Sequence, residues 1–215
     1  PVQSPTYLPG MDPWTLTNAT VHTITNTLNQ RHACNTVLEV GAWSGSSTIR
    51  LASSLSKCST VVALDTWLGS LEFYENEHTF WSKMSFITDL GIHNALNQFI
   101  YNVKHADMQN RIVPFPQSTI TGAKILWKKG IRFDAIYIDA GHEYEEVLRD
   151  LNLFWELLLP GGILFGDDYS AWPGVKKAVN EFARVHGLKV TLQPSVSMWS
   201  QPPSGIPSRD KTEYI

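Results

Sequence analysis

Short apolar runs alternate with helical patterns along most of the chain. Five runs have the length of a strand: Thr36–Gly41, Thr60–Asp65, Arg111–Phe115, Arg132–Asp139 and Gly161–Asp168. Between them, apolar residues recur every three or four positions, as on one face of a helix. Near the end, residues 188–193 and 196–200 can pair as an antiparallel hairpin. The pattern predicts an α/β fold, a Rossmann-like, doubly wound and mostly parallel seven-stranded sheet with helices on both faces.

A single domain is expected over residues 1–215. Residues 1–13 and 201–215 are rich in proline and polar residues, which predicts irregular tails. The connection from 68 to 110 is long and dense in aromatic residues, and connections of this length are usually lids or helical insertions. We expect one helix docked on the sheet and a second part over a pocket. The alternative, a helical addition that only packs into the core, stays open.

Carboxylates gather where the predicted strands end. Four of the five strand ends carry one, at Glu39, Asp65, Asp139 and the pair Asp167 and Asp168. Open α/β sheets bind ligands beyond the carboxyl ends of their strands, so this edge is the predicted site.

Composition excludes some partners. Apolar residues make up 43% and charged residues 17%, and the net charge is −3. Nothing here indicates binding to nucleic acid or to an anionic membrane, and no run approaches the ~20 apolar residues of a membrane span. Two cysteines, Cys34 and Cys58, do not define a disulfide framework, which favours a reducing compartment. With no secretory signal, a cytoplasmic location is expected.

A glycine loop follows the first strand, with the pattern Glu39-x-Gly41-x-x-x-Gly45. Trp43 stands where a dinucleotide site has its middle glycine, so a nucleotide-dependent oxidoreductase is disfavoured. Asp65, at the next strand end, can accept hydrogen bonds from ribose hydroxyls or can cap the following turn.

Four motifs together resemble the class I S-adenosylmethionine-dependent methyltransferases: "VLEVGAWSGSST", "VVALDTW", "FDAIYIDAGHEYEEVLRDL" and "LLLPGGILFGDDY". The resemblance is strongest to the Methyltransf_24 and macrocin-type sugar O-methyltransferase branch, and it spans residues 36–179. It implies S-adenosylmethionine as cofactor. By resemblance, its contacts fall on these residues: Glu39, Gly41, Gly45, Ser47, Asp65, Thr66, Trp67 and Ser118.

The resemblance also implies a divalent metal, Mg²⁺, held by Asp139, Asp167 and Asp168. Three converging carboxylates repel unless a cation compensates, and hard oxygen ligands suit Mg²⁺. The metal would hold two vicinal oxygens of the acceptor and lower the pKa of its hydroxyl. Alternatively, Asp167 caps backbone amides in a simple turn.

His142 is the candidate general base, with Asp139 beside it as the second catalytic residue. Metal-dependent relatives often carry a carboxylate two residues after the first metal aspartate, but here that position is Gly141. An imidazole accepts a proton at neutral pH. Alternatively, His142 is only a helix-entry residue.

The predicted function is O-methylation of a small hydroxylated acceptor, a sugar or a vicinal diol, dependent on S-adenosylmethionine. The alternative is a regulatory module that binds the cofactor without turnover. The resemblance also allows a homodimer, since related enzymes often pair through an N-terminal helix and extended tails.

Overall fold

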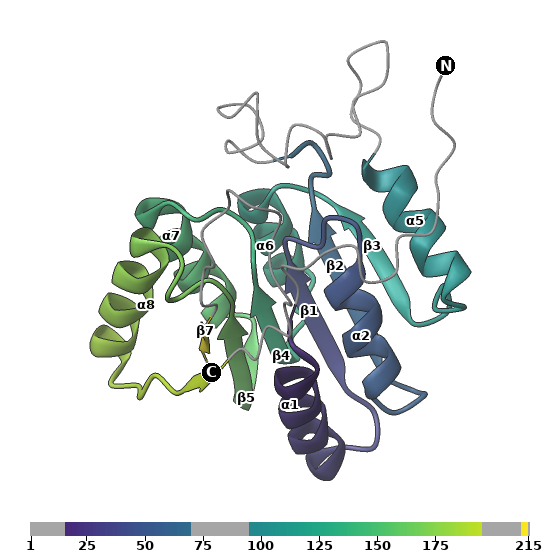
Figure 1. Ribbon diagram of the computed structural model, residues 1–215, viewed down its shortest axis with the longest axis horizontal. Coiled ribbons are helices and arrows are strands. Elements are labelled where there is room, and N and C mark those ends of the chain that lie inside the picture. The colour runs from purple at the N-terminus through teal and green to yellow at the C-terminus, as the bar shows by residue number, and fades with distance from the viewer. Residues whose placement is uncertain (1–15, 70–94, 195–211, 215) are drawn as a thin grey trace, which may run out of the picture.

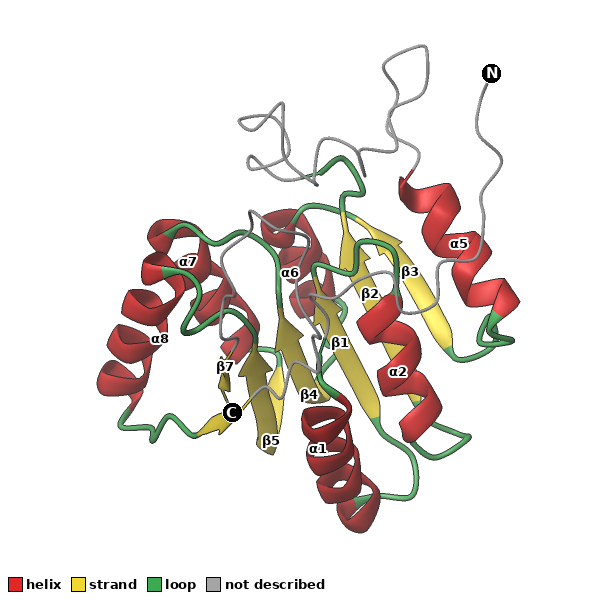
Figure 2. Cartoon of the chain, viewed as in Figure 1, coloured by secondary structure: helices red, strands yellow, loops and turns green. Residues whose placement is uncertain are grey.

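The computed structural model describes residues 16–69, 95–194 and 212–214. A twisted sheet lies between two layers of helices (Figures 1 and 2). Its five parallel strands are β1 (Thr36–Val40), β2 (Thr60–Asp65), β3 (Ile112–Pro116), β4 (Phe133–Ile138) and β5 (Leu158–Gly166). Their order is β3-β2-β1-β4-β5. The order reverses between β1 and β4, and open sheets of this type bind ligands at that point.

Helices cover both faces of the sheet. On one face lie α1 (Asn18–Arg31), α2 (Ser46–Ser54) and α5 (Ala95–His105), and on the other α6 (Thr119–Lys128), α7 (Tyr144–Trp155) and α8 (Pro173–His186). Along β4, Ala135 and Tyr137 join the first core and Ile136 and Ile138 join the second. Strands buried on both faces read as continuous apolar runs, which is why the sequence predicted them. The parallel α/β architecture is confirmed.

The edge of the sheet beyond β5, formed by the last residues of the chain, differs from the prediction. A three-residue strand, β7 (Thr212–Tyr214), pairs antiparallel with β5, and β6 (Leu192–Pro194) pairs antiparallel with β7. The parallel sheet therefore has five strands, and the predicted hairpin between residues 188–193 and 196–200 is wrong in its pairing. Residues 196–200 lie outside the described part, and the tail expected to be irregular contributes β7. A short apolar run does not identify its partner, because pairing depends on which edge strand is open.

The two cysteines form a disulfide, contrary to the expectation that they are reduced. Cys34 and Cys58 are joined, with their Cα atoms 5.2 Å apart. The cause lies in the register of β1 and β2, which pairs Thr36 with Thr60. Each cysteine lies two residues before its strand, so parallel pairing brings the two side by side. The cysteines therefore give no support for a reducing compartment. In the described residues, no helix has the length and apolar character needed to cross a membrane.

The predicted insertion at 68–110 contains α5. Phe99 on this helix is fully buried and packs against Trp67, with ring centroids 4.9 Å apart. The expected helix docked on the sheet is confirmed. The part expected over a pocket falls on residues 70–94, outside the described residues.

Candidate functional site

The loop after β1 lies directly against the end of β4. Gly41 has a φ of +94°, and a Cβ there would lie 1.9 Å from the backbone carbonyl oxygen of Asp139. Gly45 precedes α2 with a φ of +87°, and a Cβ there would lie 2.8 Å from the Phe99 ring. Glycine tolerates this backbone conformation and this close approach, which other residues do not. Both glycines are therefore required by the shape of the loop at the switch point.

Glu39 is a buried carboxyl group inside β1, with no exposed surface. The hydroxyl of Ser47 donates a hydrogen bond to its Oε1 atom. Its Oε2 atom has no hydrogen-bond partner among the residues that the structure describes. Burial raises the pKa of Glu39 to about 8, an effect partly offset by the Ser47 hydrogen bond. Buried polar atoms are normally paired, so this oxygen is available to a polar ligand group that reaches the switch point.

Asp65 ties two loops together at the end of β2. Its Oδ2 accepts the backbone N–H of Trp43 at 2.8 Å, and its Oδ1 accepts that of Trp67 at 2.7 Å. Burial raises the pKa of Asp65, while these backbone hydrogen bonds lower it. Both tryptophans have positive φ, +42° and +55°. The turn-capping role considered for Asp65 is therefore present.

The remaining predicted cofactor contacts also have partners within the protein. Trp67 is 1% exposed, and its indole N–H donates to the carbonyl of Trp43 at 2.7 Å. The Thr66 hydroxyl accepts the N–H of Leu68 at 3.2 Å. Ser118 caps α6 by accepting the N–H of Thr121 at 3.2 Å. The side chain of Trp67 thus packs inside the protein, whereas Thr66 and Ser118 are exposed at the edge of the sheet.

Helix α5 is joined to the glycine loop by buried polar side chains. Asn102 donates to the backbone carbonyl of Ser44 at 2.8 Å and accepts from Gln98 at 2.9 Å. Both side chains are buried. The helix of the insertion therefore fixes the position of the loop that would hold a ligand.

Three titratable side chains converge beyond β4 and β5. His142 Nε2 lies 3.0 Å from Asp168 Oδ2 and 3.9 Å from Asp139 Oδ1. One ligand atom from each of these residues lies within 4.8 Å of the others. Asp168 has a φ of +65°, a left-handed conformation that aspartate adopts more readily than most residues. The group offers one nitrogen and two carboxylate oxygens, a donor set that can hold a divalent cation or support a protonated imidazole.

Asp139 is oriented from inside the sheet by Tyr137. The tyrosine hydroxyl donates to Asp139 Oδ2 at 2.8 Å, and its ring stacks on Phe165 with centroids 5.1 Å apart. Burial, and then the nearby carboxylates, raise the pKa of Tyr137 well above its usual value, so the phenol keeps the proton that it donates. Tyr137 was not among the predicted site residues. The available signal was a hydroxyl two residues before the aspartate, on the same side of the strand.

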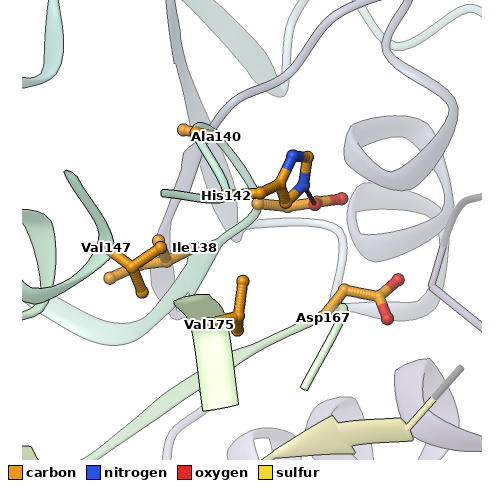
Figure 3. Close-up of a pocket in the computed structure, with 8 residues that line it drawn as sticks. Ile138, Ala140, His142, Val147, Asp167 and Val175 are labelled. Atoms are coloured by element: carbon orange, nitrogen blue, oxygen red, sulfur yellow. Dashed lines mark ion pairs between the residues drawn. The ribbon is translucent and has the colours of Figure 1, made fainter. Parts of the chain in front are cut away.

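Asp167 does not belong to the converging group. It is 3% exposed, and its Oδ1 accepts the backbone N–H of Asp168 at 2.7 Å. Its carboxylate points away from the His142 ring (Figure 3). The capping role considered for Asp167 is therefore present. Of the three aspartates predicted to bind metal, the structure brings Asp139 and Asp168 together, with His142 as the third member.

Gly141 leaves space that another carboxylate fills. A Cβ at this position would lie 2.2 Å from Oε2 of Glu146. Glu146 belongs to the first turn of α7. The carboxylate of Glu146 on α7 therefore lies where a side chain at position 141 would begin.

A small hollow beside the converging group has one apolar and one polar side. Ile138, Val147 and Val175 form the apolar side, and Asp139, His142 and Asp167 lie around the rest (Figure 3).

Comparison with known families gives one match over most of the chain. The family model Methyltransf_24, described as a methyltransferase domain, matches residues 38–169. A 51-residue stretch is 37% identical to the uncharacterized protein R132 of Acanthamoeba polyphaga mimivirus, covering 22% of this chain and 23% of that protein.

Solved structures of several methyltransferases are similar to this fold. An O-methyltransferase from Bacillus cereus, in complex with SAH, has a TM-score of 0.59 at 18% identity, covering 93% of this chain and 82% of the other. The O-methyltransferase TomG from Streptomyces achromogenes, involved in tomaymycin synthesis and in complex with SAM, has a TM-score of 0.61 at 14% identity, covering 93% and 79%. Precorrin-6y C5,15-methyltransferase from Geobacter metallireducens has a TM-score of 0.58 at 14% identity, covering 92% of this chain and 84% of the other. Identities this low show a shared fold alone.

Proposed function

Since the chain belongs to the methyltransferase-domain family Methyltransf_24, we propose that it transfers a methyl group from S-adenosylmethionine to a hydroxyl oxygen of a small acceptor. One observation carries the proposal. The glycine loop of β1 touches the end of β4, where Asp139, His142 and Asp168 converge. A cofactor on the loop and an acceptor on the converging group would therefore be neighbours.

The glycine loop and its surroundings fit the cofactor. S-adenosylmethionine supplies a methyl group on a positively charged sulfur. Oε2 of Glu39 is a buried oxygen without a partner among the described residues, beside the loop formed by Gly41 and Gly45. Asp65, at the end of β2, would bind the ribose hydroxyls. Ser47 would hold Glu39, and Thr66, Trp67 and Ser118 would line the ribose and adenine end.

His142 would accept the proton of the acceptor hydroxyl. Its Nε2 lies 3.0 Å from Asp168 Oδ2, and a carboxylate at this distance stabilises the ring once it has taken up a proton. A positioned base adds typically ~10²–10⁴-fold to a rate. Asp139 completes the catalytic pair.

The donor set fits a divalent cation, for which Mg²⁺ is the proposed choice. Asp139 and Asp168 would be its ligands, and Asp167 would order Asp168 through the backbone hydrogen bond at 2.7 Å. A cation held there would polarise the acceptor hydroxyl and would neutralise the two carboxylates. The proposed acceptor is a sugar or a vicinal diol, which would offer two adjacent oxygens to such a cation.

A second candidate is a module that binds the cofactor without turnover. The glycine at position 141, in place of a carboxylate, favours it. The carboxylate of Glu146 at that position argues for the enzyme.

Calorimetric titration with S-adenosylmethionine, S-adenosylhomocysteine and NAD tests the first step. We expect binding of the two methionine nucleosides and none of NAD; tight binding of NAD alone would overturn the proposal.

Turnover of two variants then separates the enzyme from the binding module. His142→Ala should lower turnover by at least ~10²-fold with cofactor affinity unchanged. The matched control is His22→Ala, an exposed histidine on α1. Equal turnover of the two variants would remove His142 from the mechanism. If the wild type binds the cofactor but shows no turnover, the binding module is favoured.

A further inference from the structure

The indole ring of Trp172 lies flat against the imidazole ring of His142. The ring centroids are 4.8 Å apart and the ring planes differ by 9°. Trp172 is the residue immediately before α8, so it belongs to a different element from His142, which precedes α7. The contact therefore joins two segments through the site itself.

The same turn holds Asp168 and Trp172. The backbone carbonyl of Asp168 accepts the N–H of Ala171 at 3.1 Å and of Trp172 at 3.0 Å, and Asp168 itself has a φ of +65°. This compact turn sends the Asp168 carboxylate to Nε2 of His142 and the Trp172 ring to its face. The imidazole is thus held at one edge and on one face by a single turn.

The start of α8 docks on the backbone of the same histidine. A Cβ at Gly174 would lie 2.5 Å from the carbonyl oxygen of His142 and 2.8 Å from the backbone nitrogen of Tyr144. The carbonyl of Trp172 accepts the N–H of Lys176 at 3.1 Å, which fixes Trp172 to the first turn. Trp172 is therefore anchored to a helix that cannot move away from His142 without losing this contact.

We propose that Trp172 is the positioning residue of His142: its flat contact fixes the plane of the imidazole so that Nε2 stays on Asp168. The second torsion of a histidine side chain is broad, so an imidazole held at one edge alone can still turn. A face contact from an aromatic ring removes that freedom, and aromatic pairs have a preferred geometry. That Trp172 holds the His142 ring rests on the ring geometry alone. That this matters for catalysis rests on the proposed function.

The structural part is tested by proton NMR of the histidine rings at constant pH. The His142 signals are assigned by their loss in His142→Gln. A ring stacked on indole has its protons shifted upfield by the ring current. We expect this shift in the wild type, a smaller upfield shift in Trp172→Phe, and its loss in Trp172→Leu. An unshifted His142 ring in the wild type, or the same shift in Trp172→Leu, would overturn the proposal.

The catalytic part is tested by turnover of the same variants. Trp172→Leu should lower kcat about tenfold, part of the ~10²–10⁴-fold that a positioned base supplies, with KM for the cofactor unchanged. Trp172→Phe should restore most of kcat. Trp127→Leu is the control, because Trp127 is 59% exposed on α6.

Two outcomes contradict the positioning role in catalysis. Equal kcat for the phenylalanine and leucine variants would show that the aromatic face is not needed. A parallel loss of kcat, cofactor affinity and unfolding temperature in both variants would assign Trp172 to the stability of the fold. If the wild type binds S-adenosylmethionine but transfers no methyl group, the proposed function fails, while the NMR shift still decides whether Trp172 holds His142.

Discussion

Tyr137 and Asp139 show how a buried side chain controls one at the surface of the site. The tyrosine hydroxyl occupies Asp139 Oδ2, and the other oxygen, Oδ1, lies 3.9 Å from His142 Nε2. Partners that orient a ligand from behind commonly change metal affinity or activity by ~10–100-fold when they are removed. Tyr137 therefore determines which oxygen of Asp139 faces His142 and the position of the proposed cation.

Tyr137→Phe tests this role. The ring and its packing on Phe165 remain, and only the hydroxyl is lost. We expect a higher Mg²⁺ concentration for half-maximal turnover, by about tenfold, with unchanged cofactor affinity. The measurement is turnover against Mg²⁺ concentration, with Tyr101→Phe, an exposed tyrosine on α5, as control. The same Mg²⁺ dependence in both variants would contradict the role.

Glu39 gives a prediction about stability and pH. Burial raises its pKa to about 8, from a usual value of 4.5. Between these values the unfolded chain has released the proton that the folded chain keeps. The free energy of unfolding therefore decreases as pH rises from about 4.5 to about 8.

The comparison is with Glu39→Gln, which cannot ionise. Urea unfolding at pH 5 and pH 8 should show a larger loss of stability in the wild type than in this variant. A loss of equal size in both proteins would show that Glu39 does not titrate in this range.

Among the elements, α5 joins the insertion to the glycine loop. Asn102 donates to the carbonyl of Ser44, and Phe99 packs where a side chain at Gly45 would lie. A buried carbonyl that loses its donor costs ~1–3 kcal/mol. Without Asn102, the glycine loop would shift to reduce that cost.

Asn102→Ala should therefore weaken S-adenosylhomocysteine binding, by about fivefold for each ~1 kcal/mol transmitted to the loop. Calorimetry measures the change. The control is Lys104→Ala, at an exposed position in the last turn of the same helix. Unchanged affinity in Asn102→Ala would show that the helix and the loop are energetically independent.

The sequence predicted the elements better than their side-chain partners. Continuous apolar runs, separated by helical patterns, located all five parallel strands. Because β4 and β5 are neighbours, Asp139 lies near Asp168, as expected. The separation of Asp167 from this group was not predictable, because it depends on the left-handed backbone of Asp168. Trp172 was missed for a similar reason, since its ring reaches His142 only through that turn.

For the whole molecule, the disulfide is the main difference from the sequence analysis. Cys34 and Cys58 enclose β1, the glycine loop and α2, with a sequence separation of 24. Their proximity follows from the pairing of β1 with β2, which spacing along the chain does not reveal. A disulfide that closes a loop of this length lowers the conformational entropy of the unfolded chain. This effect stabilises the fold by about 3 kcal/mol.

Replacing both cysteines by serine should lower the free energy of unfolding by about 3 kcal/mol. Adding a reductant to the wild type should have the same effect, and it should leave the serine variant unchanged. Guanidinium unfolding curves provide the measurement. Equal midpoints for the wild type with and without reductant, together with two titratable thiols in the native protein, would contradict the disulfide.

The β1 loop and the group formed by Asp139, His142 and Asp168 are expected to act together in methyl transfer. The most direct measurement is the transfer of label from methyl-labelled S-adenosylmethionine to small sugars and vicinal diols in the presence of Mg²⁺. We expect label on an acceptor oxygen in the wild type and its loss in Asp168→Asn. Transfer in Asp107→Asn, a variant at an exposed aspartate after α5, should equal that of the wild type. Transfer that is equal in wild type and Asp168→Asn, or label that never leaves a firmly bound cofactor, would contradict it.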